Sequence, residues 1–129
     1  MITLALLAGI WSTTCIQTQM SPDHQGFVVE SYHIQKDGSY EFKRSWFRDS
    51  KCSEPSGTDT ESGILELGGK ISSFFSPGNS YEANFSSEGG IDLGAIALRE
   101  NDYIMVARGV KNNNFRNTML SLFQYKKQP

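Results

Sequence analysis

Short runs of aromatic and β-branched residues, separated by Gly, Asn, Asp and Ser, restrict the fold of this chain more than any other feature. In one run, Tyr40, Phe42 and Trp46 fall on one face of an extended chain, while Glu41 and Lys43 fall on the other. This period of two is typical of a β-strand with one buried and one solvated side. The sequence contains no heptads and no long amphipathic helical pattern, so we expect an all-β protein.

The runs recur about eight times, and most connections between them are short. Asp37-Gly38 lies between two runs and is the strongest hairpin signal in the chain. About eight consecutive antiparallel strands favour a closed, lipocalin-like up-and-down barrel, because closure removes exposed strand edges. A two-sheet β-sandwich is the alternative. The expected strands are 10–20, 26–36, 39–49, 64–67, 81–86, 91–100, 103–108 and 115–126, with a polar surface loop over 50–62. Gly68-Gly69 is expected to form a bend or bulge, after which 70–75 either continues the strand over 64–67 or starts another.

Length and charge limit the number of domains and the classes of partner. The chain of 129 residues suits a single domain, which we place at 9–126. Residues 1–8 are apolar and have two interpretations, a signal-peptide remnant or a segment that closes one end of the barrel. The net charge of −2 gives no basic surface for nucleic acid, and the apolar start is too short to span a membrane.

The two cysteines, Cys15 and Cys52, each lie near a Trp-containing segment. A disulfide between them indicates an oxidising compartment, which is extracellular or periplasmic. The alternative is a pair of unrelated buried thiols in a cytosolic protein. Two cysteines are too few for a zinc site on their own, and the sequence has no Walker loop, dinucleotide fingerprint or Gly-x-Ser-x-Gly elbow. We therefore expect no metal, no cofactor and no enzymatic activity.

The tripeptide Gly9-Ile10-Trp11 is similar to the Gly-x-Trp signature on the first strand of lipocalins. In that family the Trp closes one end of the barrel and an Arg packs over its ring. The resemblance therefore implies a barrel-closing role for Trp11. The candidate arginines for the contact with its ring are Arg44, Arg99 and Arg108.

A longer pattern covers residues 7–55. It consists of Gly9-Ile10-Trp11 followed by Cys15, then Ser31-Tyr32, Tyr40-Glu41-Phe42, and the run from Trp46-Phe47-Arg48 to Cys52-Ser53-Glu54-Pro55. This pattern resembles the APCDD domain family, whose members are extracellular lipocalin-like barrels with a cavity for lipid-like ligands. The resemblance implies a secreted barrel, a disulfide between Cys15 and Cys52, and an apolar pocket.

Many large side chains are expected to point into the barrel, and they lead to two functional hypotheses. The first is a secreted lipocalin-like binding protein for a small apolar or lipid-like ligand, with small residues such as Ala95, Ala97 and Ala107 leaving room inside. The second is a solid-core barrel that acts as a protein-interaction or inhibitor domain through loops 50–62 and 109–114. The candidate ligand-binding residues are Tyr40, Phe42, Arg44, Trp46, Phe74, Tyr81, Phe85, Met105, Met119 and Phe123.

Overall fold

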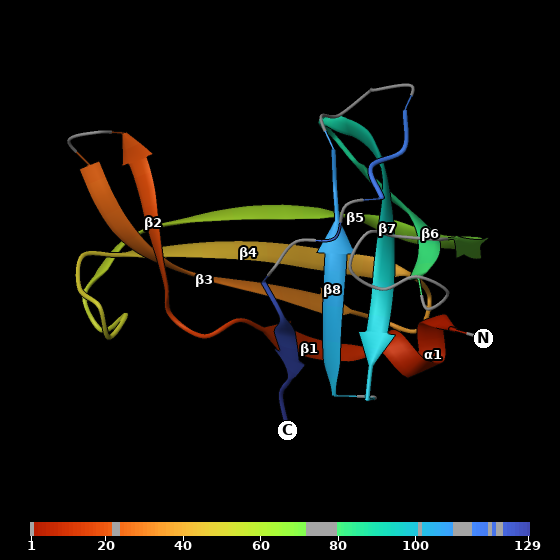
Figure 1. Ribbon diagram of the computed structural model, residues 1–129, viewed down its shortest axis with the longest axis horizontal. Coiled ribbons are helices and arrows are strands. Elements are labelled where there is room, and N and C mark those ends of the chain that lie inside the picture. Colours follow the sequence, from red (N-terminus) through yellow and green to blue (C-terminus); the bar gives the residue numbers. More distant parts are fainter. Residues whose placement is uncertain are drawn as a thin grey trace.

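The computed structural model consists of nine strands and one helical turn in the part of the chain that it describes (Figure 1). The described residues are 2–21, 24–71, 80–100, 102–109, 115–118, 120 and 123–129. The elements are α1 (Leu4–Leu7), β1 (Gly9–Ser12), β2 (Ile16–Ser21), β3 (His24–Ile34), β4 (Ser39–Phe47), β5 (Pro55–Ile71), β6 (Ser80–Ser87), β7 (Gly90–Arg99), β8 (Tyr103–Ala107) and β9 (Tyr125–Lys127).

Eight of these strands form a closed antiparallel barrel. The order runs from β1 through β9, β8, β7, β6, β5 and β4 to β3, and β1 also pairs with β3. Trp11 is the residue at which the ring closes, because it is opposite Tyr32 of β3 on one side and Lys127 of β9 on the other. The predicted all-β barrel is confirmed, and the alternative sandwich is not what the chain forms.

The strand expected over 10–20 is divided into β1 and β2. Between them the backbone N–H of Thr13 donates to the carbonyl oxygen of Glu30 at 2.9 Å, and the N–H of Glu30 donates to Thr13 Oγ1 at 3.0 Å. These two bonds replace regular ladder pairing at the break. As a result, β1 continues around the barrel, while β2 pairs only with β3 as the ninth strand.

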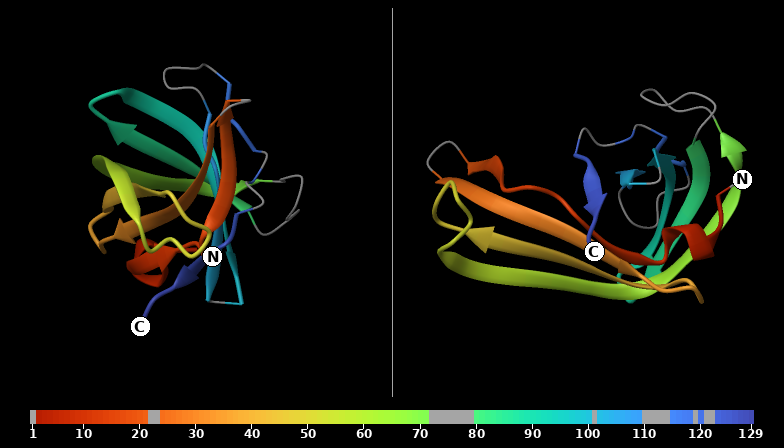
Figure 2. Two further views of the ribbon diagram at one scale, coloured as in Figure 1. Left: turned by 90° about the vertical axis from the view of Figure 1, so that its left-hand side faces the viewer. Right: turned by 90° about the horizontal axis from the view of Figure 1, so that it is seen from below.

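Strands β2 to β5 extend beyond the barrel as a four-stranded arm, which Figures 1 and 2 show from three directions. The polar loop predicted over 50–62 is wrong from Pro55 onward, because β5 begins there and pairs with β4 as far as Ile64. Most side chains of this part of β5 are exposed, so it needs no apolar residues and gives no alternating signal.

The strand predicted over 115–126 is also wrong in extent, since β9 covers only Tyr125–Lys127 and residues 115–118 form no strand. Arg116 and Asn117 instead bind the edge of β7 that β8 leaves open. The N–H of Asn117 donates to the Leu93 carbonyl at 2.9 Å, and Arg116 Nη1 donates to the Gly94 carbonyl at 2.8 Å. Residues 110–114 of the second predicted loop, and residues 72–75 of a predicted strand, lie outside the described residues.

The Asp37-Gly38 hairpin is confirmed between β3 and β4. Gly38 has a φ of 94°, a region that favours glycine, and its N–H donates to the Gln35 carbonyl at 3.0 Å. Asp37 Oδ1 accepts from the N–H of Ser39 at 2.9 Å, so the turn is held by both backbone and side chain.

The core fills the closed part of the barrel. Trp11 is fully buried, and its Nε1 donates to the carbonyl oxygen of Leu7 in α1 at 2.8 Å. Ile2 and Leu7 belong to the same core cluster, so the apolar start of the chain packs against the barrel. The other buried members are Tyr32, Ile34, Tyr40, Leu65, Ala83, Phe85, Ile96, Ile104, Val106 and Tyr125.

A lysine, not one of the three candidate arginines, provides the cation over Trp11. Lys127 Nζ lies 5.5 Å from the centre of the indole, a cation–π distance. Arg44 and Arg108 lie over other rings, and Arg99 contacts the sulfur of Met105 at 3.9 Å. β9 is directly opposite Trp11 in the ladder, which explains why a residue of the last strand takes this position.

The small residues of β7 and β8 lie on the face opposite to the one that the sequence analysis assumed. Ala95, Ala97 and Ala107 form a second cluster with Met105 and Leu120, while the alternating residues of the same strands belong to the main core. The alanines therefore leave no room inside the barrel. They provide a flat surface against which Leu120 is buried.

The predicted disulfide between Cys15 and Cys52 is present, with 5.8 Å between the Cα atoms. It joins the β1–β2 connection to the β4–β5 loop. Asp49 organises that loop by accepting from the N–H groups of Ser53 and Glu54 at 2.9 and 2.8 Å, and the bonds from Ser53 lower the pKa of Asp49. In the described part of the chain, no helix is both long enough and apolar enough to span a membrane.

Removing the disulfide is expected to lower the free energy of unfolding without changing the fold. The cysteines are 37 positions apart, and the chain-entropy model gives about 4 kcal/mol for a loop of this length. Urea denaturation of the variant with Cys15→Ala and Cys52→Ala measures the loss. The wild-type protein in reductant is the control and should show the same loss; an unchanged unfolding midpoint in both samples would contradict the prediction.

Candidate functional site

A cavity of about 400 Å³, which is widely open to solvent, lies beside the packed core on the inner faces of the strands. Residues from β3, β4, β5, β7, β8 and β9 line it, together with residues of the connection between β8 and β9. Five of the lining side chains carry charge, which differs from the apolar pocket that the family resemblance implies. The lining residues are Glu30, Tyr32, Phe42, Arg44, Glu61, Asp92, Val106, Arg108, Gly109, Phe123 and Tyr125.

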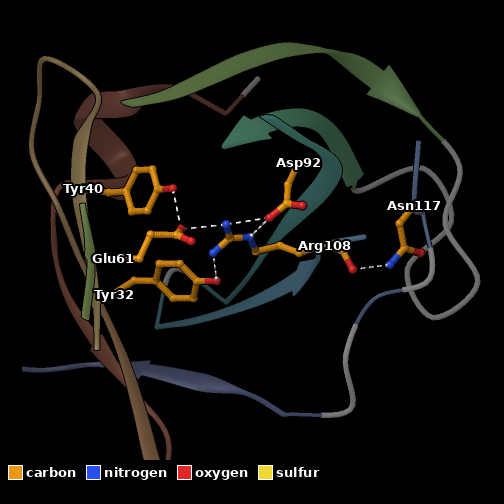
Figure 3. A network of polar contacts seen from close by, with 6 residues as sticks. All are labelled: Tyr32, Tyr40, Glu61, Asp92, Arg108 and Asn117. Carbon is orange, nitrogen blue, oxygen red and sulfur yellow. Dashed lines mark hydrogen bonds and ion pairs between the residues drawn. The ribbon is translucent and has the colours of Figure 1, made fainter. Parts of the chain in front are cut away.

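Arg108 is the centre of a polar network that crosses the barrel interior (Figure 3). Its Nη2 lies 2.6 Å from Asp92 Oδ2 and 2.7 Å from Glu61 Oε1, and its Nε donates to Asp92 Oδ2 at 2.9 Å. Tyr40 donates its hydroxyl to the same Glu61 oxygen at 2.7 Å. The guanidinium also lies 4.6 Å from the centre of the Phe85 ring, so one cation engages two carboxylates and an aromatic face.

A second ion pair lies on the inner faces of β3 and β4. Arg44 Nε and Nη2 donate to Glu30 Oε2 at 2.8 and 2.7 Å, and the Tyr125 hydroxyl donates to Glu30 Oε1 at 2.7 Å. The Arg44 guanidinium lies 5.7 Å from the Phe42 ring and 5.8 Å from the Trp46 ring. The Glu30 side chain is 7% exposed and that of Arg44 is 41% exposed, so the carboxylate is buried while the guanidinium reaches the cavity.

Three tyrosines of the site have raised pKa values. Burial is the main cause for Tyr32, where it outweighs the opposing effect of Arg108 and raises the pKa to about 12. Burial also raises the pKa of Tyr40 and of Tyr125, and their hydrogen bonds to Glu61 and Glu30 act in the same direction. The three hydroxyls therefore stay protonated near neutral pH, and Tyr40 and Tyr125 can donate to their carboxylates.

Three of the predicted ligand-binding residues, Phe42, Arg44 and Phe123, line the cavity. Tyr40 and Phe85 are buried in the core next to it and contact the Arg108 network. Tyr40, Phe42 and Arg44 come from β4, Phe85 comes from β6, and Phe123 lies in the connection before β9, so the barrel brings three separate parts of the chain together.

The other predicted residues lie elsewhere. Trp46 is on the arm beside Arg44, where its Nε1 donates to Asp59 Oδ2 at 3.1 Å. Tyr81 packs against the core without lining the cavity, and Met105 faces the outer cluster. Phe74 and Met119 lie outside the described residues.

The acidic residues of the site, Glu30, Glu61 and Asp92, are not among those predicted from the sequence. Glu30 alternates with Val28 and Tyr32 on β3, which places a carboxylate on an otherwise apolar face. Arg44 breaks the apolar face of β4 in the same way, and the two residues are directly opposite in the ladder. Two opposite charges at apolar positions of neighbouring strands are a signal of a buried ion pair that could have been found. Glu61, in the polar stretch taken for a loop, offered no such signal.

Among the residues that the structure describes, no group of three or more His, Cys, Asp or Glu side chains is placed to hold a metal ion. The arrangement instead offers fixed charges, three phenolic hydroxyls and aromatic faces around one cavity. Such a site can orient a small molecule that has both polar and apolar parts.

Comparisons with known proteins give no match to a family model, to a curated protein or to a solved structure. The resemblance of residues 7–55 to APCDD domains therefore stays a prediction.

Replacing Arg108 with Met should destabilise the protein by about 3 kcal/mol, because Glu61 and Asp92 would keep buried negative charge without a counter-ion. Chemical denaturation at pH 7 measures the effect. Arg108→Lys should give an intermediate loss, since it keeps the charge but not the multiple donors. A loss below about 1 kcal/mol for Arg108→Met would show that the network is not the main support of the interior.

The free energy of unfolding should fall between about pH 10 and 12. Tyr32 has a pKa of about 12 in the folded protein and about 10 when unfolded, so its contribution is complete below pH 10 and is lost as the pH rises to 12. Tyr32→Phe should make this decline shallower. Denaturation curves at several alkaline pH values, with phenolate absorbance as a control for ionisation, test this; parallel declines in both proteins would contradict it.

Proposed function

We propose that this chain is a secreted lipocalin-like binding protein that holds one small lipid-like molecule in the barrel cavity. The observation that carries the proposal is the cavity of about 400 Å³, which falls in the size range of small-molecule sites. Its aromatic and aliphatic lining, from Phe42, Val106 and Phe123, suits an apolar segment. Its charged lining requires that the molecule also has a polar end, since an apolar group placed there would separate the charges from water without replacing hydrogen bonds.

The disulfide supports the secreted part of the proposal. A bond between Cys15 and Cys52 persists in oxidising compartments and is rare in the cytosol. The resemblance of residues 7–55 to an extracellular domain family agrees with this location. The proposed role is binding without catalysis, because the charged groups of the cavity are held in ion pairs and not arranged as a nucleophile with a base.

A second candidate function is a protein-interaction domain. The observation in its favour is Phe115, which is 81% exposed in the segment between β8 and β9. Exposed aromatic side chains on connecting segments are common at interfaces between proteins. This function would use the outside of the barrel and would leave the cavity without a role.

Ligand titration tests the carrier function, with Trp fluorescence as the signal. Trp46 lies beside Arg44 while Trp11 is buried in the core, so a ligand should change the emission of Trp46. We expect saturable one-to-one binding for amphiphiles in a panel of fatty acids, fatty alcohols and sterols. Calorimetry gives the stoichiometry, and Trp46→Phe should remove most of the signal while binding remains measurable by heat.

Two variants connect the binding to the cavity. Phe123→Ala, on the lining, should weaken binding about tenfold by removing apolar contact. Ile64→Ala is the matched control, because Ile64 is 47% exposed and does not line the cavity. Absence of binding across the whole panel, with a folded protein, would rule out the carrier function and favour the interaction domain.

A further inference from the structure

The two arginines of the cavity differ in how fully their donors are used. Arg108 directs Nε and Nη2 to Asp92 and Glu61, and its Nη1 lies 3.5 Å from the Tyr32 hydroxyl. Its side chain is only 17% exposed. The guanidinium of Arg108 is thus enclosed by groups of the protein itself and has little capacity for a ligand.

The guanidinium of Arg44 still has hydrogen-bond donors available for a ligand. Its Nε and Nη2 both donate to one oxygen, Glu30 Oε2, and within the described part of the chain Nη1 has no hydrogen-bond partner. The side chain is 41% exposed and lines the cavity. One edge of this planar group is therefore bound and the other edge is open.

The bound edge fixes the position of the open one. Glu30 is buried, and its second oxygen is held by the Tyr125 hydroxyl, so the carboxylate cannot easily turn away from Arg44. The same guanidinium also lies over the rings of Phe42 and Trp46, at 5.7 and 5.8 Å from their centres. A guanidinium held in this way is pre-organised, so a ligand would pay little entropy to order it.

The aromatic faces do not favour a cationic ligand. The Phe42 ring already has the guanidinium carbons of Arg44 and Arg108 at 5.7 and 5.9 Å from its centre. A ligand ammonium group over this ring would meet two positive charges in place of an open π face. The open Nη1 of Arg44 can donate to an acidic headgroup, whereas the Phe42 ring offers no open π face to a cation.

We propose that the open edge of Arg44 binds the carboxylate of an acidic amphiphile, whose apolar part lies along Phe123 and Val106. This inference rests on the proposed function and adds the chemical class of the ligand. A planar carboxylate matches the guanidinium geometry and accepts charge-assisted hydrogen bonds from it. Arg44 is thus assigned as the residue that selects an acid over a neutral molecule of the same length.

Asp59 provides an independent test of whether the ligand headgroup at Arg44 is negatively charged. It is directly opposite Arg44 on β5, is exposed, and its Oδ2 accepts from Trp46 Nε1. Its carboxylate repels an anionic headgroup at Arg44. Asp59→Asn removes the charge and keeps an oxygen that can accept from Trp46.

The experiment compares three ten-carbon probes that differ only in the headgroup: decanoate, decanol and decyltrimethylammonium. In wild-type protein at pH 7 and low salt, calorimetry should show decanoate binding about tenfold more tightly than decanol, with the ammonium probe weakest. In Arg44→Gln the dissociation constants for decanoate and decanol should converge. In Asp59→Asn decanoate should bind two- to threefold more tightly, with decanol unchanged, which is about the effect of one exposed charge.

The outcomes separate the two proposals. If the three probes bind wild-type protein with equal affinity, or if the ammonium probe binds best, the assignment of Arg44 is overturned while the carrier function stands. If no probe binds, and the fatty acid panel also fails, the carrier function itself is overturned. Asp59→Asn retains the three ion pairs of the cavity, so it gives a decisive result even if Arg44→Gln does not fold. A looser complex of decanoate with Asp59→Asn would overturn the assignment.

Discussion

The burial of charge inside the barrel is the constraint on which the interior depends. Arg108, Asp92 and Glu61 come from three different strand regions, and the two carboxylates can be buried at low cost only because each lies within hydrogen-bonding distance of the Arg108 guanidinium. A shift of any of these strands by one residue would turn its charged group to the outer face and leave the remaining groups unpaired. The network therefore favours the observed register of β5, β7 and β8 over registers shifted by one residue.

The barrel is also uneven around its circumference, and this places the cavity. β5 has 17 residues, whereas β1 has four and β9 has three. The break at Thr13 ends β1 early, and the ladder between β1 and β9 contains only two residue pairs. The barrel is therefore short along its axis on the side of β1 and β9, while the opposite side is built from long strands. Phe123 and Tyr125 are the residues that line the cavity on the short side.

Much of the strand pattern could be predicted from the sequence, because period-two alternation of large side chains reports burial on one face. This worked for β4 and β6, where Tyr40, Ala83 and Phe85 occupy core positions as expected. It failed for the first half of β5, whose residues are mostly polar on both faces, and for residues 115–118, where Arg116 and Asn117 bind the edge of β7 without forming a strand. Alternation also does not show which of the two faces of a strand points into the barrel, so Met105 and the alanines were assigned to the wrong face. The charged residues of the cavity could be predicted only in part. Arg44 could be recognised because it interrupts the apolar face of β4, but identifying Glu30 as its partner requires the register between β3 and β4.

The position of the disulfide has a consequence for how the chain responds to proteases. Cys15 and Cys52 enclose β2, β3 and β4 in one covalent loop, which includes the hairpin turn at Gly38. A single cut anywhere within that loop leaves both fragments attached to each other, and their strands remain paired in the sheet. A nicked molecule would therefore migrate as one species until it is reduced, and a single proteolytic cut in this loop would not by itself release a piece of the barrel.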